Sequence, residues 1–288
     1  MIWHDIRDPK DPQLDELAKR YNLHPLHIED CRNRNQAAKV EPMNDYLFIV
    51  LKPVDMTEEY NLRIADLDFF IGTDWIITVQ EDKCENATDA LNKVKSAGPK
   101  LRSDEIFYRV MDVVVDGYQP VIDRVSDRID EMEDQAIANP DPGMLENVFD
   151  LKRVLIQLRR LLANTRDVVG HLLRNEFPLI RQDLAPFLRD VYDHLIRNLD
   201  LIEIHRDLLS GTTELYLSSV ANRTNQVMKV LTVFGTIATP ALVITGVYGM
   251  NLKHIPFAES PHSWGIVIGM IALVSLLVLA VLKRWKML

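Results

Sequence analysis

The stretch from Val230 to Asn251, VLTVFGTIATPALVITGVYGMN, decides the fold of this chain. Its first 21 residues, up to Met250, carry no charge, and at about 1.5 Å per helical residue they extend roughly 30 Å, the thickness of a bilayer core. A second uncharged stretch of 19 residues runs from Trp264 to Leu282. We therefore predict two transmembrane helices, 230–250 and 264–282, joined by the loop 251–263. The alternative, two core helices of a soluble domain, is disfavoured because no later segment would cover them.

Basic residues outside the loop predict the orientation of the two spans. They are Lys229 before the first span and Lys283, Arg284 and Lys286 after the second. The loop has only Lys253, offset by Glu259. The positive-inside tendency therefore places both termini and the basic tail 283–288 in the cytoplasm, with the loop outside. The N-terminus has no charged-then-apolar signal peptide, which agrees with a cytoplasmic start. We expect the protein in the inner (plasma) membrane.

The charge of the chain is concentrated before the spans. The net charge is −9, and the segment from Lys229 onward has five basic residues and one acidic residue, +4, so residues 1–228 carry −13. An acidic body attracts cations and argues against binding nucleic acid, which needs a basic face. Cys31 and Cys84 show no CxxC spacing, so no thiolate metal site is indicated. Motifs for enzymatic chemistry, such as HExxH, a phosphate loop or GxSxG, are absent, and we expect neither an enzyme nor an organic cofactor.

Residues 1–100 predict an α/β domain. Tyr46–Leu51 is a continuous β-rich run typical of a buried strand. A second run, Ile64–Ile71, alternates polar and apolar residues from Asp66 to Phe69, and turns at 72–74 into a third run, Trp75–Val79. These two runs predict a β-hairpin.

Residues 101–182 predict a helical hairpin. Helical periodicity covers Ser103 to about Ala138 and Met144 to about Arg174, and Asn139-Pro140-Asp141-Pro142-Gly143 separates the two segments with a strong turn signal. The acidic residues near its tip are interpreted as a solvated face.

A long stalk helix, 183–229, is predicted to continue into the first span. Asp183 is a plausible N-cap, and Pro186 is tolerated in the first turn. From Pro186 to Tyr248 the single rod would measure roughly 95 Å. Apolar residues recur at steps of three, four or seven, which predicts helix packing within a subunit or between subunits. They are Leu188, Val191, Leu195, Leu199, Ile202 and Leu209.

One face of this rod changes from acidic to uncharged. Asp193, Asp200, Asp207 and Glu214 are seven residues apart. Toward the first span the same face continues through small or uncharged residues. They are Asn225, Met228, Leu231, Gly235, Thr239, Leu242 and Gly246. Several copies around an axis would form carboxylate rings that concentrate cations and a narrow uncharged pore that gates by desolvation. The alternative is a merely hydrated acidic face.

Two motifs carry a resemblance to a known family. The stretch 216–232, YLSSVANRTNQVMKVLT, followed by Pro240 and by Tyr248-Gly249-Met250-Asn251, resembles the CorA-type magnesium transporters. Weaker similarity extends upstream through 189–194, 46–52 and 24–30, so nearly the whole chain is covered.

The resemblance implies an α+β fold with an N-terminal cytoplasmic α/β domain, a long helical stalk and two C-terminal transmembrane helices per subunit, assembled as a homopentameric funnel. It implies uptake of Mg²⁺, with cobalt or nickel as further transported ions, and closure of the channel by cytoplasmic Mg²⁺. By position, Gly249, Met250 and Asn251 form the outer selectivity entrance. The resemblance also places Asn225, Met228, Leu231 and Gly246 in the pore lining, and the helical face described above adds Glu214, Gly235, Thr239 and Leu242 to the residues expected to line it.

The resemblance also implies a regulatory cation site between subunits. Asp30 would face Asp190 of the partner subunit across the ion, with Glu29 and Asp112 nearby. Two positions depart from the family pattern, since many relatives have methionine where Thr239 stands and threonine where Leu242 stands.

Three alternatives remain open at this stage. A zinc transporter of a related branch shares the Gly-Met-Asn signature. His24, His27, Glu29 and Asp30 have the side chains of a transition-metal cluster. A membrane-tethered acidic scaffold without conduction fits the composition and the spans, but would not require Asn251.

Overall fold

The computed structural model describes residues 1–33, 36–58, 60–80, 85–96, 101–174, 177–250, 256–257 and 261–284. The chain divides into two compact units, Met1–Leu215 and Tyr216–Leu288. Helix α7 (Ala185–Tyr248) contributes residues to both units.

A five-stranded sheet forms the centre of the first unit. Its strand order is β1 (Ile2–Ile6), β7 (Trp75–Gln80), β6 (Leu67–Ile71), β3 (Leu47–Leu51) and β2 (Lys39–Pro42). Strand β1 pairs parallel to β7 and the other neighbours pair antiparallel. The predicted hairpin is confirmed as β6–β7, with Ile71 opposite Ile76. Gly72 is required at its turn, because a Cβ there would lie 2.2 Å from the indole of Trp75.

The predicted strand 64–71 is wrong in extent. Strand β6 begins at Leu67, and Leu62–Ile64 forms a separate strand, β5, whose one strand partner in the described ranges is β4 (Val54–Met56). The polar-apolar alternation also misleads, because Asp66 and Asp68 are only 7% and 2% exposed. Helices cover both faces of the sheet, so the alternating polar residues are buried as well.

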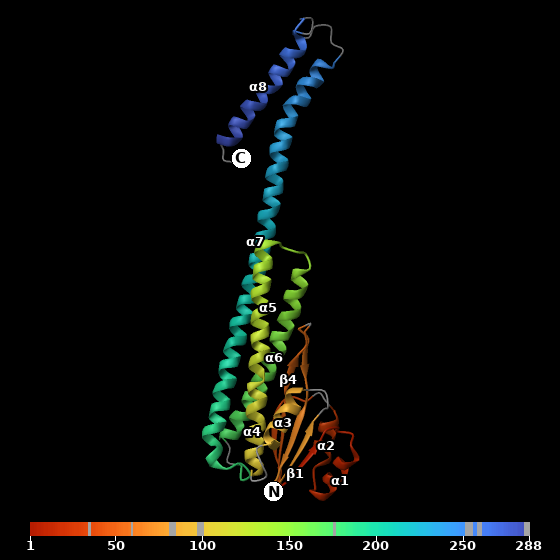
Figure 1. The fold of residues 1–288 in the computed structure, drawn as a ribbon, viewed down its shortest axis with the longest axis vertical. Coiled ribbons are helices and arrows are strands. Elements are labelled where there is room, and N and C mark those ends of the chain that lie inside the picture. Colours follow the sequence, from red (N-terminus) through yellow and green to blue (C-terminus); the bar gives the residue numbers. More distant parts are fainter. Residues whose placement is uncertain are drawn as a thin grey trace. The chain divides into compact units, whose positions relative to one another are not determined.

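Helices pack on both faces of this sheet (Figure 1). On one face, α1 (Pro12–Arg20) and α2 (Pro25–Arg32) form a core with Phe48, Val50 and Phe70. On the other face lie α3 (Glu85–Ser96) and α4 (Ser103–Asp116), where Phe107 meets Phe69 edge to face at 5.2 Å. The result is a three-layer α/β/α arrangement.

The predicted helical hairpin is confirmed. It consists of α5 (Tyr118–Ala138) and α6 (Met144–Arg174), separated by the turn 139–143. The prediction of one helix from Ser103 to Ala138 is wrong, since α4 ends at Asp116 and α5 begins at Tyr118. Pro120 has no N–H to donate to the carbonyl of Asp116, which interrupts the helical hydrogen bonds at this point.

Helix α7 is continuous over 64 residues, as the composition predicts. Its expected N-cap is wrong: Asp183 lies in a 3₁₀ turn, Gln182–Leu184, and accepts a hydrogen bond from Arg102 at 3.3 Å. The predicted apolar seam is buried within a single chain. Its exposed fractions are 2% for Leu188, 0% for Val191, 0% for Leu195, 1% for Ile202 and 2% for Leu209, and Leu199 is half-buried.

The second unit contains the C-terminal half of α7 and helix α8 (Ser263–Arg284). Both helices are long and apolar enough to cross a membrane, and only 0% and 6% of their most apolar windows are buried. Core helices of a soluble protein are mostly buried, so this observation disfavours that alternative.

Candidate functional site

Partial burial in the second unit follows one stripe on each helix. On α8 the less exposed residues recur at steps of three and four. They are Ser263, Ile266, Val267, Met270, Ile271, Val274, Ser275, Val278, Leu279 and Leu282. On α7 the less exposed residues include Val233, Ile237, Ala241, Ile244 and Tyr248. Such stripes are typical of two helices that cover each other along one face.

The opposite face of α7 is exposed. Successive helical residues rotate by about 100°, so the stripe that includes Val233 and Ile244 lies roughly 180° from a second set. This exposed set is Met228, Leu231, Gly235, Thr239, Leu242 and Gly246. These are six of the residues predicted to line a pore. The other two, Asn225 in this unit and Glu214 in the first unit, are also exposed.

Threonine hydroxyls on α7 are satisfied within the helix. Thr232, Thr236, Thr239 and Thr245 each donate to the carbonyl four residues earlier, at 2.7, 2.6, 2.7 and 2.8 Å. In an apolar environment this leaves no hydroxyl donor unpaired. The oxygen of Thr239 is therefore left on the exposed face as an acceptor.

The helix ends immediately before the Gly-Met-Asn motif. Gly249 donates its N–H to the carbonyl of Thr245 at 2.9 Å, and Met250 donates to Val247 at 3.3 Å. The hydroxyl of Tyr248 donates to the carbonyl of Pro256 at 2.9 Å. Gly249 and Met250 are exposed, and Asn251 lies outside the described residues, as does Lys253.

In the first unit, Asp30 already has a cationic partner. Its carboxylate accepts from Lys39 Nζ at 2.7 Å and from Gln36 Nε2 at 2.9 Å. Lys39 also donates to Glu41 at 2.9 Å, and Glu41 lies 2.8 Å from Nε2 of His27. Burial lowers the pKa of Lys39, but hydrogen bonds to Asp30 and Glu41 outweigh burial and raise it. The ammonium group is therefore held as a cation against Asp30.

The proposed transition-metal cluster is not formed. His27 is buried, stacks on Phe48 with ring centroids 4.3 Å apart and contacts the hydroxyl of Tyr46 at 2.8 Å. Burial lowers the pKa of His27 despite its hydrogen bond to Glu41. Glu29 is exposed. Within the described ranges, no group of three or more His, Cys, Asp or Glu side chains is arranged to hold a metal.

Asp112 and Asp190 belong to a second cluster, between α4 and α7. His194 joins it, with Nδ1 3.5 Å from Asp116 and Nε2 3.9 Å from Asp190. Burial raises the pKa of Asp112, and the charges of Asp116 and Asp190 raise it further. Carboxylates that repel one another are stabilised by a nearby cation, but within one chain the described side chains of this cluster are not arranged to hold a metal ion by themselves.

The structure separates the predicted regulatory residues within one chain. Asp112 and Asp190 share the α4–α7 cluster, whereas no contact among the described residues joins Asp30 to Asp190. Sequence reasoning missed His194, although its i, i+4 spacing from Asp190 was a usable signal. It also missed Lys39, because Asp30 lies on α2 and Lys39 on β2, and no helical periodicity records a contact between two elements.

Comparison with known proteins gives a consistent result. The sequence profile of the family described as "CorA-like Mg²⁺ transporter protein" matches residues 1–284. The chain is 33% identical over 279 residues to "Cobalt/magnesium transport protein CorA" of Thermotoga maritima, covering 95% of this chain and 79% of that protein. It is 28% identical to "Putative metal ion transporter YfjQ" of Bacillus subtilis, covering 98% and 89%.

A solved structure has the same fold. The complete structure of the CorA magnesium transporter from Methanocaldococcus jannaschii matches with a TM-score of 0.85 at 24% identity, covering 98% of this chain and 90% of that chain. The predicted α+β architecture with a long helix and two C-terminal apolar helices is confirmed.

Proposed function

Because this chain belongs to the CorA-like Mg²⁺ transporter family, we propose that it forms a homopentameric channel for Mg²⁺ uptake, with α7 lining the pore. The family consists of transporters of divalent cations rather than enzymes, and this chain is a transporter of this family. The observation that carries the proposal is the exposed α7 face from Met228 to Gly246, opposite the stripe that is partly covered. In an assembly of several copies around one axis, the uncharged and small side chains of this exposed transmembrane face would form rings.

Conduction would use two kinds of ring. Met228, Leu231 and Leu242 would form apolar constrictions that gate by loss of water, because an ion crossing them loses stabilising contacts. Gly235 and Gly246 would leave wider sections, and the Thr239 oxygen would offer an acceptor to ion-bound water. The acidic residues from Asp193 to Glu214 would concentrate cations at the cytoplasmic mouth.

Selection would take place at Gly249, Met250 and Asn251. Mg²⁺ keeps its inner water shell tightly. A ring of Asn251 amide oxygens would accept hydrogen bonds from these waters without removing them. Neutral oxygens bind more weakly than carboxylates, which favours release of the ion into the pore.

Regulation would use cations bound between subunits. Asp30 of one subunit, with Glu29 nearby, would approach Asp190 of the partner subunit and the Asp112 cluster. A divalent ion would relieve repulsion among these carboxylates and favour the closed channel, which couples Mg²⁺ concentration to gating. Mg²⁺ would first have to displace Lys39 from Asp30, and this competition would lower the affinity of the site.

The membrane arrangement follows the basic residues. Lys229, Lys283 and Arg284 would lie on the cytoplasmic side, with both termini inside and the loop 251–263 outside. In a bacterial cell this corresponds to the inner membrane.

Flux into proteoliposomes tests the function. Uptake of Mg²⁺, Co²⁺, Ni²⁺ and Zn²⁺ would be compared with and without a pH gradient, with protein-free liposomes as the control. We expect Mg²⁺ flux that does not require a proton gradient. Zn²⁺ flux driven by protons would favour the zinc transporter instead, and absence of all flux would favour the non-conducting scaffold. Native mass spectrometry of the detergent-solubilised protein should give five copies of the 33.1 kDa chain.

A further inference from the structure

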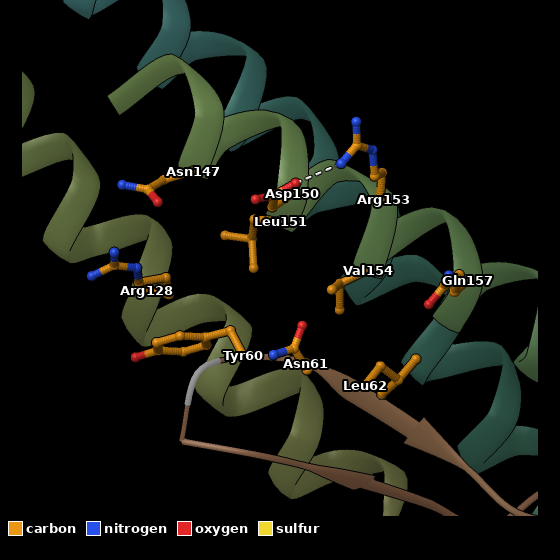
Figure 2. A pocket seen from close by; sticks show the side chains of 10 residues that line it. All are labelled: Tyr60, Asn61, Leu62, Arg128, Asn147, Asp150, Leu151, Arg153, Val154 and Gln157. Atoms are coloured by element: carbon orange, nitrogen blue, oxygen red, sulfur yellow. Dashed lines mark hydrogen bonds and ion pairs between the residues drawn. The ribbon is translucent and has the colours of Figure 1, made fainter. Parts of the chain in front are cut away.

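A groove in the first unit runs along one side of α6. Its first part is a cavity of about 410 Å³ between α5, α6 and the tip of the β4–β5 ribbon (Figure 2). Its second part, about 600 Å³, lies between α6, β5 and the segment 36–38. Gln157 lines both cavities, so they are adjacent along the helix. Each cavity has a volume in the range of roughly 300–1,000 Å³ that is typical of small-molecule sites.

The floor of the groove is apolar. Leu62 and Ile64 are two residues apart on β5 and therefore project from the same face of the strand. Leu151, Val154 and Leu161 of α6 complete the floor, and Figure 2 shows Leu151 and Val154 pointing into the first cavity. An apolar floor suits the carbon skeleton of an organic ligand.

Polar side chains follow the groove along α6. Arg153, Gln157, Arg160 and Asn164 line it at spacings of four, three and four residues, which places them on one face of the helix. Over these eleven residues the helix rises roughly 16 Å, the length of an extended nucleotide-sized molecule.

The wall opposite α6 in the first cavity is rigid. Arg124 donates to the carbonyls of Met56 and Thr57 at 2.7 and 3.0 Å, which fastens the ribbon tip to α5. The guanidinium groups of Arg124 and Arg128 lie 5.8 and 5.2 Å from the ring centroid of Tyr60. Tyr60 itself has φ of 58°, a left-handed backbone that is unfavourable for tyrosine and is held there by the surrounding contacts. A preformed wall of this kind lowers the entropic cost of binding.

The groove is positive within an acidic body. Its lining carries Lys52, Arg128, Arg153 and Arg160 against Asp66 and Asp150, a net charge of +2, whereas residues 1–228 carry −13. Lys52 is paired with Asp66, Arg153 with Asp150 at 2.6 Å and Arg128 with Glu131 at 2.7 Å. No hydrogen bond or ion pair joins Arg160 to any residue in the described part of the chain. A positive groove repels Mg²⁺, so it is not one of the cation sites proposed above.

From these features we propose that the α6 groove binds a small phosphorylated molecule of nucleotide size. Guanidinium groups match phosphate oxygens with two parallel hydrogen bonds. Arg160 has this capacity unused. Arg153 can also turn to the ligand, because the Arg153–Asp150 pair is exposed and such pairs contribute only about 0–1 kcal/mol. The apolar floor then holds the remainder of the molecule, and Gln157 and Asn164 are placed to hydrogen-bond it.

Ligand binding to the purified full-length protein tests this proposal. Isothermal titration calorimetry would compare ATP, inorganic pyrophosphate and adenosine in buffer containing EDTA, so that the phosphates are free of Mg²⁺. We expect ATP to bind and adenosine to bind at least tenfold more weakly. Pyrophosphate that binds as tightly as ATP would show that the apolar floor adds no affinity, and would overturn the assignment to a ligand of nucleotide size. Adenosine that binds as tightly as ATP would overturn the proposal.

Matched arginine variants locate the site. Arg160→Gln should weaken ATP binding about tenfold, the loss expected for one hydrogen-bonded charge. Arg166→Gln, also on α6 but outside the groove and paired with Asp167, should leave it unchanged. Arg160 is exposed and unpaired within the described chain, so its replacement leaves the fold intact, and circular dichroism checks this. Equal affinity in the two variants, or no ATP binding by the unmodified protein, contradicts the proposal without affecting the transport proposal.

Discussion

The protonation state of single residues in this protein depends on their burial, on neighbouring charges and on hydrogen bonds. Asp68 is the clearest case: it is 2% exposed on β6, and burial raises its pKa to about 7. The charge of Asp66 contributes to this rise in pKa, while the thiol of Cys31, which donates a hydrogen bond to Asp68, and the charge of Lys52 oppose it. Near neutral pH this carboxyl group is therefore close to half protonated inside the α/β core.

A pH-dependent stability follows from Asp68. Its pKa is about 7 in the folded chain and about 3.9 when unfolded, so its stabilising contribution is complete below pH 4 and is lost as the pH rises through 7. At about 1.4 kcal/mol per unit, the upper limit is ~4 kcal/mol. Asp68→Asn should flatten the fall in melting temperature between pH 5 and pH 8, measured by circular dichroism. Asp45→Asn, at an exposed position, should keep the full fall in melting temperature. An equal fall in both variants would refute the assignment of this pH dependence to Asp68.

Asn251 carries the proposed ion recognition. Asn251→Ala removes the amide oxygens that would accept hydrogen bonds from hydrated Mg²⁺, so uptake into proteoliposomes should fall to background while the pentamer persists. Asn222→Ala removes an exposed amide on α7, away from the face proposed to line the pore, and should retain uptake. Unchanged flux in Asn251→Ala would remove this residue from the mechanism.

Local sequence patterns predicted some residues better than others. The buried seam from Leu188 to Leu209 was predictable because it depends only on helical spacing. The pair Asp30–Lys39 and the contact of Asp183 with Arg102 were not, because each joins two different elements or segments and no helical spacing relates the partners. Asn251 stays a prediction, since it lies outside the described residues.

At the scale of elements, α7 combines two environments in one helix. Between Leu188 and Leu209 its apolar seam is buried within the first unit. Between Met228 and Gly246 it has one partly covered stripe and one exposed face. The absence of interior proline before Pro240 made this continuity predictable, whereas the break between α4 and α5 depends on the single missing N–H of Pro120.

The acidic face of α7 should act through long-range charge. Glu214→Gln would lower Mg²⁺ conductance most at low ionic strength, because salt near 0.1 M screens charges over about 10 Å. The measurement is single-channel or liposome flux at 10 and 300 mM monovalent salt. Glu203→Gln, whose carboxylate is already paired with Arg159 and Arg206, is the matched control. A salt-independent loss in Glu214→Gln would argue against a ring of surface charge.

At the scale of the whole molecule, a single chain leaves the proposed sites incomplete. Asp30 and the Asp190 cluster do not meet within one chain, and the exposed α7 face has no described partner. Both features are what a subunit of a symmetric assembly would show. The sequence predicted the residues of these surfaces, but the contacts between copies remain a prediction.

Gating by Mg²⁺ should respond in opposite directions to two changes. Asp30→Lys combined with Asp190→Lys removes the proposed inter-subunit cation site, so the channel should stay open at millimolar cytoplasmic Mg²⁺. Lys39→Met removes the competing ammonium, so closure should need roughly tenfold less Mg²⁺, the effect of about 1.4 kcal/mol. Patch recordings with stepped cytoplasmic Mg²⁺ measure both.

Lys19→Met, at an exposed position on α1, controls for the loss of one positive charge. Normal closure by Mg²⁺ in the Asp30→Lys, Asp190→Lys double variant would contradict the assignment of a regulatory site to these two residues. An unchanged Mg²⁺ requirement in Lys39→Met would show that the ammonium does not compete for Asp30.

The fastening of the β4–β5 ribbon by Arg124 also affects how the chain withstands digestion. Among the described strands, β5 pairs with β4 alone, and the carbonyls of Met56 and Thr57 accept hydrogen bonds from one guanidinium group. Proteases need a substrate that can be drawn out as a loose strand. Because Arg124 holds the ribbon against α5, together with the pairing of β5 to β4 and the hydrogen bond from Asn86 to the carbonyl of Val54, we expect the peptide bond after Arg63 to be a poor target for trypsin.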